Sequence, residues 1–334
     1  MEEILIIQTA FIGDVILSTA VGRKIAQHDP NASIDYLVRK GNETLVDHLD
    51  FVNNVWIWDK KHQKHRNLWR LVQEIRKQKY DKVVNLQRFL SSGLFTSLSK
   101  GRETYGFDKN PLSFCFTHKV AHEIGNGKHE TARNQALIAS FTDEKPIRPV
   151  LQPERVETVK IEAYTGQEYI CIAPASVWYT KQFPTEKWVE FINQLPDNLQ
   201  IYMLGAPGDS QMVNDIRRGC GEHQIHDLCG QLSLLESAAL MQKAKMNYVN
   251  DSAPLHLASA VNAPVRAIFC STVPEFGFGP LSDDARTIEI EKKLHCRPCG
   301  LHGKRACPIG TFECALEIDT VKMANELNTI LKTR

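Results

Sequence analysis

The chain has 334 residues, too many for one typical hydrophobic core, so two domains are expected. Hydrophobic residues make up 43% and charged residues 24%, and the net charge of +1 argues against a general attraction to nucleic acid. The first residues are acidic and no apolar run approaches ~20 residues, so neither a signal peptide nor a membrane-spanning helix is predicted.

The first half alternates strand and helix patterns. An apolar run at 4–7 is followed by a short loop with Gly13 and Asp14, then by apolar residues at helical spacing, which predicts strand, tight loop and helix. The other elements expected here are strands at 34–38, 55–58 and 82–86 and helices at about 67–78 and 89–98. This alternation predicts a parallel sheet covered by helices on both faces.

Residues 142–168 are polar and contain three prolines, which is typical of an interdomain linker. We therefore expect one domain at 1–150 and a second at 165–334. The second half repeats the alternation, with strands expected at 169–173, 201–204, 246–249 and 265–269 and helices at about 185–195, from 210, 233–243, from 255 and 320–332. Thr185 is expected to cap one of these helices, and Ser233 with Glu236 to form a capping box. Two similar α/β halves suggest a cleft between them.

Asp14 lies after the first strand, at the sheet edge where open α/β proteins bind ligands. A carboxylate near the start of a helix is either a helix cap or a general base. The residues around Asp14 leave both interpretations open.

Loops after strands of the second half carry small and polar residues. Ser252 and Ala253 open a helix, whose free N–H groups suit a phosphate. Lys181 could neutralise a diphosphate, and Asp209 could accept a hydrogen bond from a ribose hydroxyl. There is no Walker A or GxGxxG sequence, which disfavours a P-loop NTPase or an ordinary dehydrogenase.

Each of these side chains also has an ordinary structural interpretation. A lysine after a strand is usually a surface residue, and Asp251 before a helix is usually a cap. His256, on a helix, is more often a hydrogen-bonded structural histidine than a catalyst.

The segment from Lys60 to Lys82 is strongly basic. Most of its charges fit a solvated helix face. A tighter group, expected to lie outside the helix, suits an anionic substrate. This group consists of Lys60, Lys61, Lys64 and Arg66.

Four blocks occur in an order that resembles a known family. They are Gly13-Asp14, Ala173-Pro174-Ala175-Ser176 followed by Lys181-Gln182-Phe183-Pro184, Leu204-Gly205-Ala206-Pro207, and Asp251-Ser252-Ala253-Pro254-Leu255-His256-Leu257-Ala258-Ser259-Ala260. Together they resemble glycosyltransferase family 9, the ADP-heptose:lipopolysaccharide heptosyltransferases. The resemblance covers nearly the whole chain.

This resemblance implies a GT-B fold, with two Rossmann-like domains facing across a cleft and no metal required for catalysis. It implies an inverting transfer of heptose from ADP-heptose to the lipopolysaccharide inner core, with Asp14 as general base. It also implies a cytoplasmic enzyme in transient contact with the inner membrane, with the acceptor on the N-terminal domain. The residues that it assigns to donor binding are Ser176, Lys181, Asp209, Asp251, Ser252, Ala253 and His256.

Two alternatives to this function stay open. One is a related transferase that uses another nucleotide sugar for O-antigen or capsule synthesis. The other is a non-catalytic nucleotide- or metal-binding relative, in which loss of Asp14 or Lys181 would be expected. Both residues are present.

The nine cysteines form two sets. Five are scattered and suit reduced, mostly buried thiols. The other four lie within nineteen residues with the spacing C-x2-C-x7-C-x6-C, which predicts either a structural zinc site or a basic surface excursion with reduced thiols. These four are Cys296, Cys299, Cys307 and Cys314.

Overall fold

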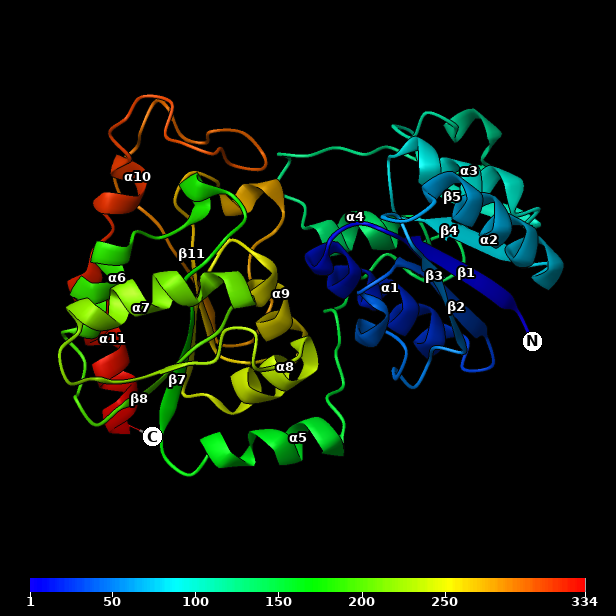
Figure 1. Ribbon diagram of the computed structural model, residues 1–334. Coiled ribbons are helices and arrows are strands. Elements are labelled where there is room, and N and C mark those ends of the chain that lie inside the picture. Colours follow the sequence, from blue (N-terminus) through cyan, green and yellow to red (C-terminus); the bar gives the residue numbers. More distant parts are fainter. Residues whose placement is uncertain (334) are drawn as a thin grey trace. The chain divides into compact units, whose positions relative to one another are not determined.

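The computed structural model describes residues 1–333, which form two compact units, Met1–Gln152 (unit 1) and the chain from Pro153 onward (unit 2). The division falls inside the predicted linker at 142–168. Each unit has its own parallel sheet and its own core, as the α/β prediction expects (Figure 1).

Unit 1 contains a six-stranded parallel sheet with the order β3-β2-β1-β4-β5-β6. Its strands are β1 (Glu3–Gln8), β2 (Ser33–Arg39), β3 (Asn54–Trp58), β4 (Lys82–Asn85), β5 (Glu103–Phe107) and β6 (His118–Val120). Its helices are α1 (Ile12–His28), α2 (Lys64–Gln78), α3 (Leu90–Leu98) and α4 (Glu130–Ala136). α2 and α3 pack together beside β3 and β4, whereas α1 packs on β1, β2 and α4.

The core under α2 and α3 explains why these segments are helical. α2 buries Leu68, Leu71, Val72 and Ile75 at helical spacing and leaves its charged residues outside. These side chains pack with the rest of a cluster in which Trp58 and Phe95 meet edge to face, with ring centroids 5.2 Å apart.

Unit 2 repeats the architecture with the strand order β12-β11-β10-β7-β8-β9. Its strands are β7 (Tyr169–Ala173), β8 (Gln200–Met203), β9 (Gln224–Asp227), β10 (Met246–Asn250), β11 (Val265–Ile268) and β12 (Ala285–Ile288). Its helices are α5 (Arg155–Ile161), α6 (Thr185–Ile192), α7 (Ser210–Gly219), α8 (Leu234–Lys243), α9 (Ala253–Ala260), α10 (Glu313–Leu316) and α11 (Thr320–Thr333). α6 packs with α7 and α11, and α8 packs with α5 and α9.

Every strand and helix that the sequence predicts is present within a few residues of its expected limits. The capping box of Ser233 and Glu236 is confirmed, with Glu236 N–H donating to Ser233 Oγ at 3.2 Å. The cap assigned to Thr185 is wrong, because Pro184 precedes the first turn of α6 and no side chain caps it. Several short elements were not predicted, namely β5, β6, β9, β12, α4, α5 and α10. Three of these, β6, β9 and β12, are edge strands of three or four residues, which carry too little apolar pattern to be recognised.

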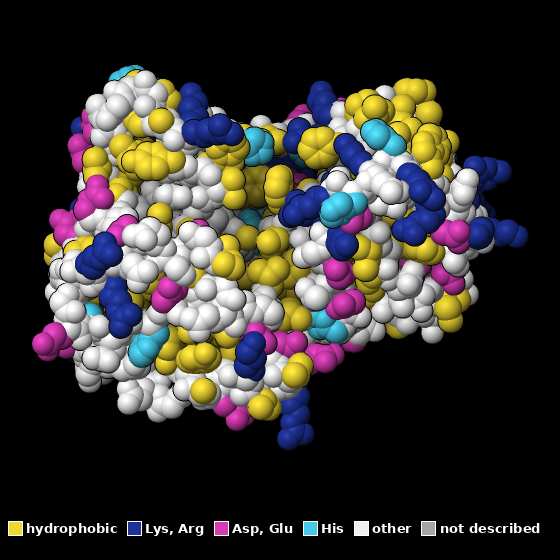
Figure 2. Space-filling model, viewed as in Figure 1, with side chains coloured by type: hydrophobic (Ala, Val, Ile, Leu, Met, Phe, Trp, Pro, Cys, Tyr) yellow, Lys and Arg dark blue, Asp and Glu magenta, His cyan; other side chains and the backbone are white. Residues whose placement is uncertain are grey.

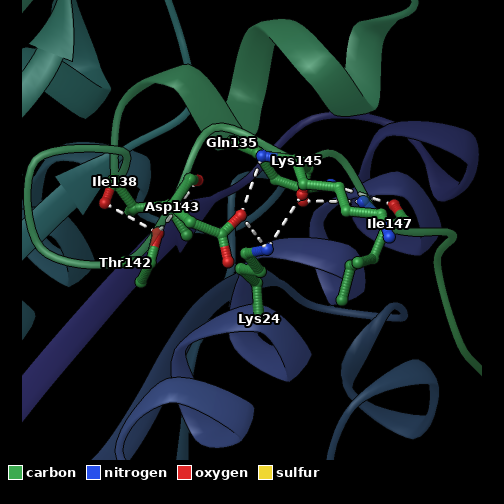
Figure 3. A network of polar contacts seen from close by, with 7 residues as sticks. All are labelled: Lys24, Gln135, Ile138, Thr142, Asp143, Lys145 and Ile147. Atoms are coloured by element: carbon green, nitrogen blue, oxygen red, sulfur yellow. Dashed lines mark hydrogen bonds and ion pairs between the residues drawn. The ribbon is translucent and has the colours of Figure 1, made fainter.

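The predicted linker is more ordered than its composition suggests. Lys24 of α1 is almost buried, and its ammonium group pairs with Asp143 and donates to the carbonyl of Lys145 at 2.9 Å (Figure 3). The amide of Gln135 exchanges two hydrogen bonds of 2.9 Å with the backbone of Ile147. A buried ammonium group requires such partners, so the first part of the linker is fixed on unit 1.

None of the helices in residues 1–333 combines the length and the apolar character that a membrane crossing requires.

Candidate active site

Asp14 occupies the first turn of α1, directly after the loop that follows β1. Its carboxylate accepts a hydrogen bond of 3.2 Å from the backbone N–H of Phe11, the residue that precedes the helix. Asp14 therefore caps α1, as the simpler interpretation predicts. A cap of this kind also fixes the direction of the carboxylate, so it is compatible with a chemical role.

The surroundings of Asp14 make it a competent base near neutral pH. Burial raises the pKa of Asp14 to about 6, and the nearby charge of Glu130 adds to the rise. The Phe11 N–H and, more weakly, Arg39 oppose it. A carboxylate with a pKa near the working pH is suited to general base catalysis.

Side chains from three neighbouring loops hold the loop that carries Asp14. Gln87, after β4, accepts from the N–H and hydroxyl of Thr9 at 3.1 and 2.8 Å. Lys60, after β3, donates to the Thr9 carbonyl at 2.5 Å, and Asn42, after β2, donates to the Ala10 carbonyl at 3.1 Å. Four strands thus contribute to one polar edge of the sheet.

Lys60 is the member of the predicted basic group that lies at this edge. Its ammonium group stands over the Trp58 ring, 4.7 Å from the centroid. Burial, and then the charges of Arg39 and Lys64, lower the pKa of Lys60 to about 8. An added anion would relieve this accumulation of positive charge.

The other three basic residues are exposed. Lys64 and Arg66 were expected outside the helix, and this is wrong, because α2 begins at Lys64. The first turn of a helix is a poor place for cations, since the positive end of the helix dipole lies there. Lys61 lies in the preceding turn, where its backbone N–H donates to Asp59.

In unit 2, Lys181 and Asp251 form an ion pair across the ends of two neighbouring strands. Lys181 Nζ lies 2.7 Å from Asp251 Oδ2, and the side chains are 14% and 8% exposed. Thr272, after β11, donates to the same oxygen at 2.6 Å. A largely buried pair of this kind has a defined geometry, and Lys181 can exchange a carboxylate partner for a phosphate.

Asn250 fixes the loop that carries Lys181. It is the last residue of β10, and its amide donates to the Pro174 carbonyl at 2.6 Å and accepts from the Phe183 N–H at 3.0 Å. Both ends of the 174–183 loop are thereby fastened to β10. β10 and β7 are adjacent in the sheet, so Lys181 and the start of α9 share one site.

The start of α9 lies at this site. Ser252 precedes the helix and makes no side-chain cap, while Ala253 is its first residue. Pro254 has no N–H, and the Leu255 N–H donates to the Ser252 carbonyl at 3.1 Å, so the backbone N–H groups of Ser252 and Ala253 are those that can donate to a ligand. Ser176 is half-buried on the Lys181 loop, and its carbonyl accepts from Gln182 at 2.6 Å.

The remaining two predicted donor residues have more local surroundings. His256 is buried on α9, with its ring 6.4 Å from that of Phe278. Asp209 accepts from the backbone N–H of Ala206 at 2.7 Å and so caps the turn before α7. Its contact with a ribose stays a prediction.

Several residues of these two sites escaped the sequence analysis. Gln87, Glu130 and Asn250 are buried polar residues; Gln87 and Asn250 lie at strand ends, and Glu130 is the first residue of α4. In the described residues, the Gln87 amide nitrogen is buried without a hydrogen-bond partner, which is costly unless a ligand or water accepts from it. Only the position of Asn250 at the end of an apolar strand offered a signal.

The four clustered cysteines line a single cavity of about 210 Å³ in unit 2. All nine cysteines are reduced in the described chain. Within residues 1–333, no three His, Cys, Asp or Glu side chains already stand as a ready set of metal ligands.

Two units, each with a six-stranded parallel sheet, helices on both faces and polar loops at the strand ends, have the GT-B fold. The particular family follows from the sequence. Residues 68–306 match the model of glycosyltransferase family 9 (heptosyltransferase), and the chain belongs to this family.

The relatives agree with this assignment. The chain is 26% identical over 280 residues to lipopolysaccharide heptosyltransferase 3 of Escherichia coli, covering 78% of this chain and 82% of the relative. It is 23% identical to lipopolysaccharide heptosyltransferase 2 of E. coli K12, covering 98% of both. The structure of E. coli ADP-heptose lps heptosyltransferase II superimposes with a TM-score of 0.82 at 21% identity, covering 99% of this chain and 98% of that one.

Proposed function

We propose that this glycosyltransferase is an inverting, metal-independent enzyme that moves a heptose from ADP-heptose to the inner core of lipopolysaccharide. The observation that carries the proposal is the largely buried Lys181–Asp251 pair beside the Ser252 and Ala253 N–H groups at the start of α9. A cation beside free helix N–H groups is a site for a diphosphate. The acceptor class comes from the relatives, which are named for lipopolysaccharide.

The donor site stabilises the leaving group. As the bond between the sugar C1 and the diphosphate oxygen breaks, negative charge collects on that oxygen. Lys181 and the first N–H groups of α9, with Ser252 and Ala253, bind this diphosphate. Asp251 holds Lys181 before the donor arrives and then contacts the sugar, with Ser176, Asp209 and His256 around the rest of the donor.

Asp14 supplies the base. Its carboxylate takes the proton from the acceptor hydroxyl while that oxygen bonds to C1 from the side opposite the diphosphate. One new C–O bond replaces the old one with inversion, and the proton ends on Asp14. Lys181 and the helix N–H groups do the work that a metal ion does in other transferases, so no metal enters this mechanism.

The basic group of unit 1 binds the anionic acceptor. Replacing Lys61, Lys64 and Arg66 together by Glu is expected to raise the acceptor KM by roughly tenfold or more, because three attractions for an anion become three repulsions. All three residues are changed at once because each is exposed to solvent and contributes little alone. ADP affinity, measured by calorimetry, should stay within about twofold, since the donor site belongs to unit 2. An unchanged acceptor KM would contradict this role.

A further surface of unit 1 suits the membrane in which such an acceptor lies. Phe89, Leu90 and Phe114 are 53–75% exposed; the exposed Arg88 directly precedes Phe89, and the exposed Lys109 lies five residues before Phe114. Asn110 joins the two segments by donating to the Phe89 carbonyl at 3.1 Å. Figure 2 shows hydrophobic and basic side chains together over the α3 part of unit 1. Exposed apolar side chains with cations suit transient contact with an anionic bilayer, here the cytoplasmic face of the inner membrane.

This contact predicts a lipid dependence. Sedimentation with vesicles that contain anionic lipid should retain the wild-type chain, and the Phe89→Ser/Phe114→Ser variant should be retained several-fold less. The variant should keep its ADP affinity. Equal retention on purely zwitterionic vesicles would argue against the charged part of the surface.

A donor screen tests the proposed reaction. Release of ADP, UDP or GDP is measured from a panel of nucleotide sugars with a core-lipid acceptor. We expect release of ADP from ADP-heptose that depends on the acceptor. Turnover of a UDP- or GDP-sugar instead would favour O-antigen or capsule synthesis, and binding without turnover of any donor would indicate a non-catalytic relative.

A further inference from the structure

The segment 296–314 (the cysteine segment) encloses a cavity that the proposed reaction does not use. The segment forms the long loop that leads into α10, together with the first two residues of that helix (Figure 1). Cys314 is buried, and the other three thiols are half-buried around the same cavity of about 210 Å³. Four thiols in one place suit a soft, tetrahedral cation such as Zn²⁺.

The backbone of the cysteine segment is shaped around its sulfur atoms. Gly300, directly after Cys299, has φ +101°, and Gly310 has φ +78°. A side chain would strain both turns.

The cysteine segment also contacts the Lys181 loop (residues 174–183). Lys304 and Thr180 are joined by two hydrogen bonds, of 2.8 Å to the Thr180 hydroxyl and 3.1 Å from the Thr180 N–H. Gly303, with φ +76°, lies against Lys181, so that a Cβ at Gly303 would stand 2.8 Å from Lys181 Cγ. The next residue after Thr180 is Lys181 itself.

Four further hydrogen bonds connect the cysteine segment, through residues 270–272, with the Lys181 loop and with Asp251. The Cys299 N–H donates to the Ser271 carbonyl at 2.8 Å, and the Ser271 N–H donates to the Thr180 carbonyl at 3.2 Å. Arg297 donates to the carbonyls of Cys270 and Thr272 at 2.8 and 2.7 Å. Thr272 in turn holds Asp251, so the cysteine segment supports both members of the ion pair.

We propose that Cys296, Cys299, Cys307 and Cys314 bind one Zn²⁺ ion, and that this ion holds the cysteine segment against the Lys181 loop. In the described residues the four thiols line one cavity but do not point at a common centre. Binding of the ion therefore requires their side chains to turn toward a common point in that cavity. The zinc is structural, positions Lys181, and takes no part in the transfer. The second half of this proposal rests on the proposed donor site, whereas the first half does not.

Metal analysis of the full chain, purified without chelator from zinc-supplemented cells, tests the first half. About one zinc ion per chain is expected in the wild type, and well below half a zinc ion per chain in the Cys296→Ser/Cys299→Ser variant. The matched control is Cys115→Ser, at an exposed cysteine of unit 1, which should keep its zinc. A wild-type chain without zinc overturns the site, and iron in its place overturns the choice of metal.

ADP binding by calorimetry tests the second half. Removing zinc with a chelator should weaken ADP binding by about tenfold, the size of effect expected when the groups that hold a binding residue in position are lost. Adding zinc back should restore the affinity. Gly303→Ala should weaken ADP binding while keeping its zinc, because the new methyl group displaces Lys181. Gly221→Ala is the control, since it has φ +60° in the same unit with nothing within 4 Å of the added carbon.

The two parts fail in different ways. If the protein binds zinc but its ADP affinity is unchanged by chelation and by Gly303→Ala, the coupling to Lys181 is wrong. If the protein binds zinc but does not bind ADP at all, the proposed donor site is wrong and the metal site is still supported.

Discussion

Replacing Asp14 by Asn should lower kcat by about 10²–10⁴-fold, the range that a general base contributes. The amide oxygen of Asn can still accept from the Phe11 N–H, so the cap of α1 is kept while the base is lost. ADP affinity should change by less than about twofold, because the donor site lies in unit 2. Steady-state kinetics and calorimetry on the same preparation measure both quantities.

The control for Asp14 is Asp29→Asn, at the carboxyl end of the same helix. It should keep wild-type turnover, because Asp29 has no part in the proposed chemistry. A near-normal rate in Asp14→Asn would leave Asp14 as a cap alone.

The acidic limb of the pH profile belongs to the same prediction. Asp14 acts as a base only when it is ionised, so kcat/KM should fall as the pH drops through about 6. The contribution of Asp14 to the stability of the fold depends on pH in the opposite direction from its contribution to kcat/KM. Because the folded pKa lies above the unfolded value of about 3.9, the stability from protonated Asp14 is present below pH 4 and lost as the pH rises through about 6. Asp14→Asn should therefore raise the Tm at pH 8 but not at pH 4.

Replacing Lys181 by Met should weaken ADP binding by about 10–100-fold, since charge-assisted hydrogen bonds contribute about 1.5–3 kcal/mol. It should also destabilise unit 2, because Asp251 keeps a largely buried charge without its cation. Calorimetry with ADP and thermal unfolding separate the two effects. Lys322→Met is the control, since Lys322 forms an ion pair with Glu291 in which both side chains are exposed, and such pairs contribute little.

The double variant Lys181→Met/Asp251→Asn distinguishes a structural pair from a donor site. Neutralising both partners removes the buried charge, so much of the lost Tm should return. ADP affinity should stay low, because the cation for the diphosphate is still missing. Recovery of ADP binding together with the Tm would mean that Lys181 only neutralises Asp251.

The regular elements could be predicted because their patterns are local. Apolar runs of strand length, as at β1 and β7, and the helical spacing of buried residues in α2 are written in a few consecutive residues. β6 and β12 were missed because short edge strands are defined by a neighbour rather than by their own pattern. Lys64 was expected in a loop because a helix that begins with cations lacks the usual start signals.

By itself, the sequence determined the alternation of strands and helices, the order of the polar loops and the family, and through the family it singled out Asp14 and Lys181. Tertiary structure decided what surrounds these residues. Glu130 acts on Asp14 from 116 positions away, and Asn250 fastens both ends of the Lys181 loop. Ion pairing and desolvation depend on distance in space, and no local pattern records which distant side chains the sheet brings together.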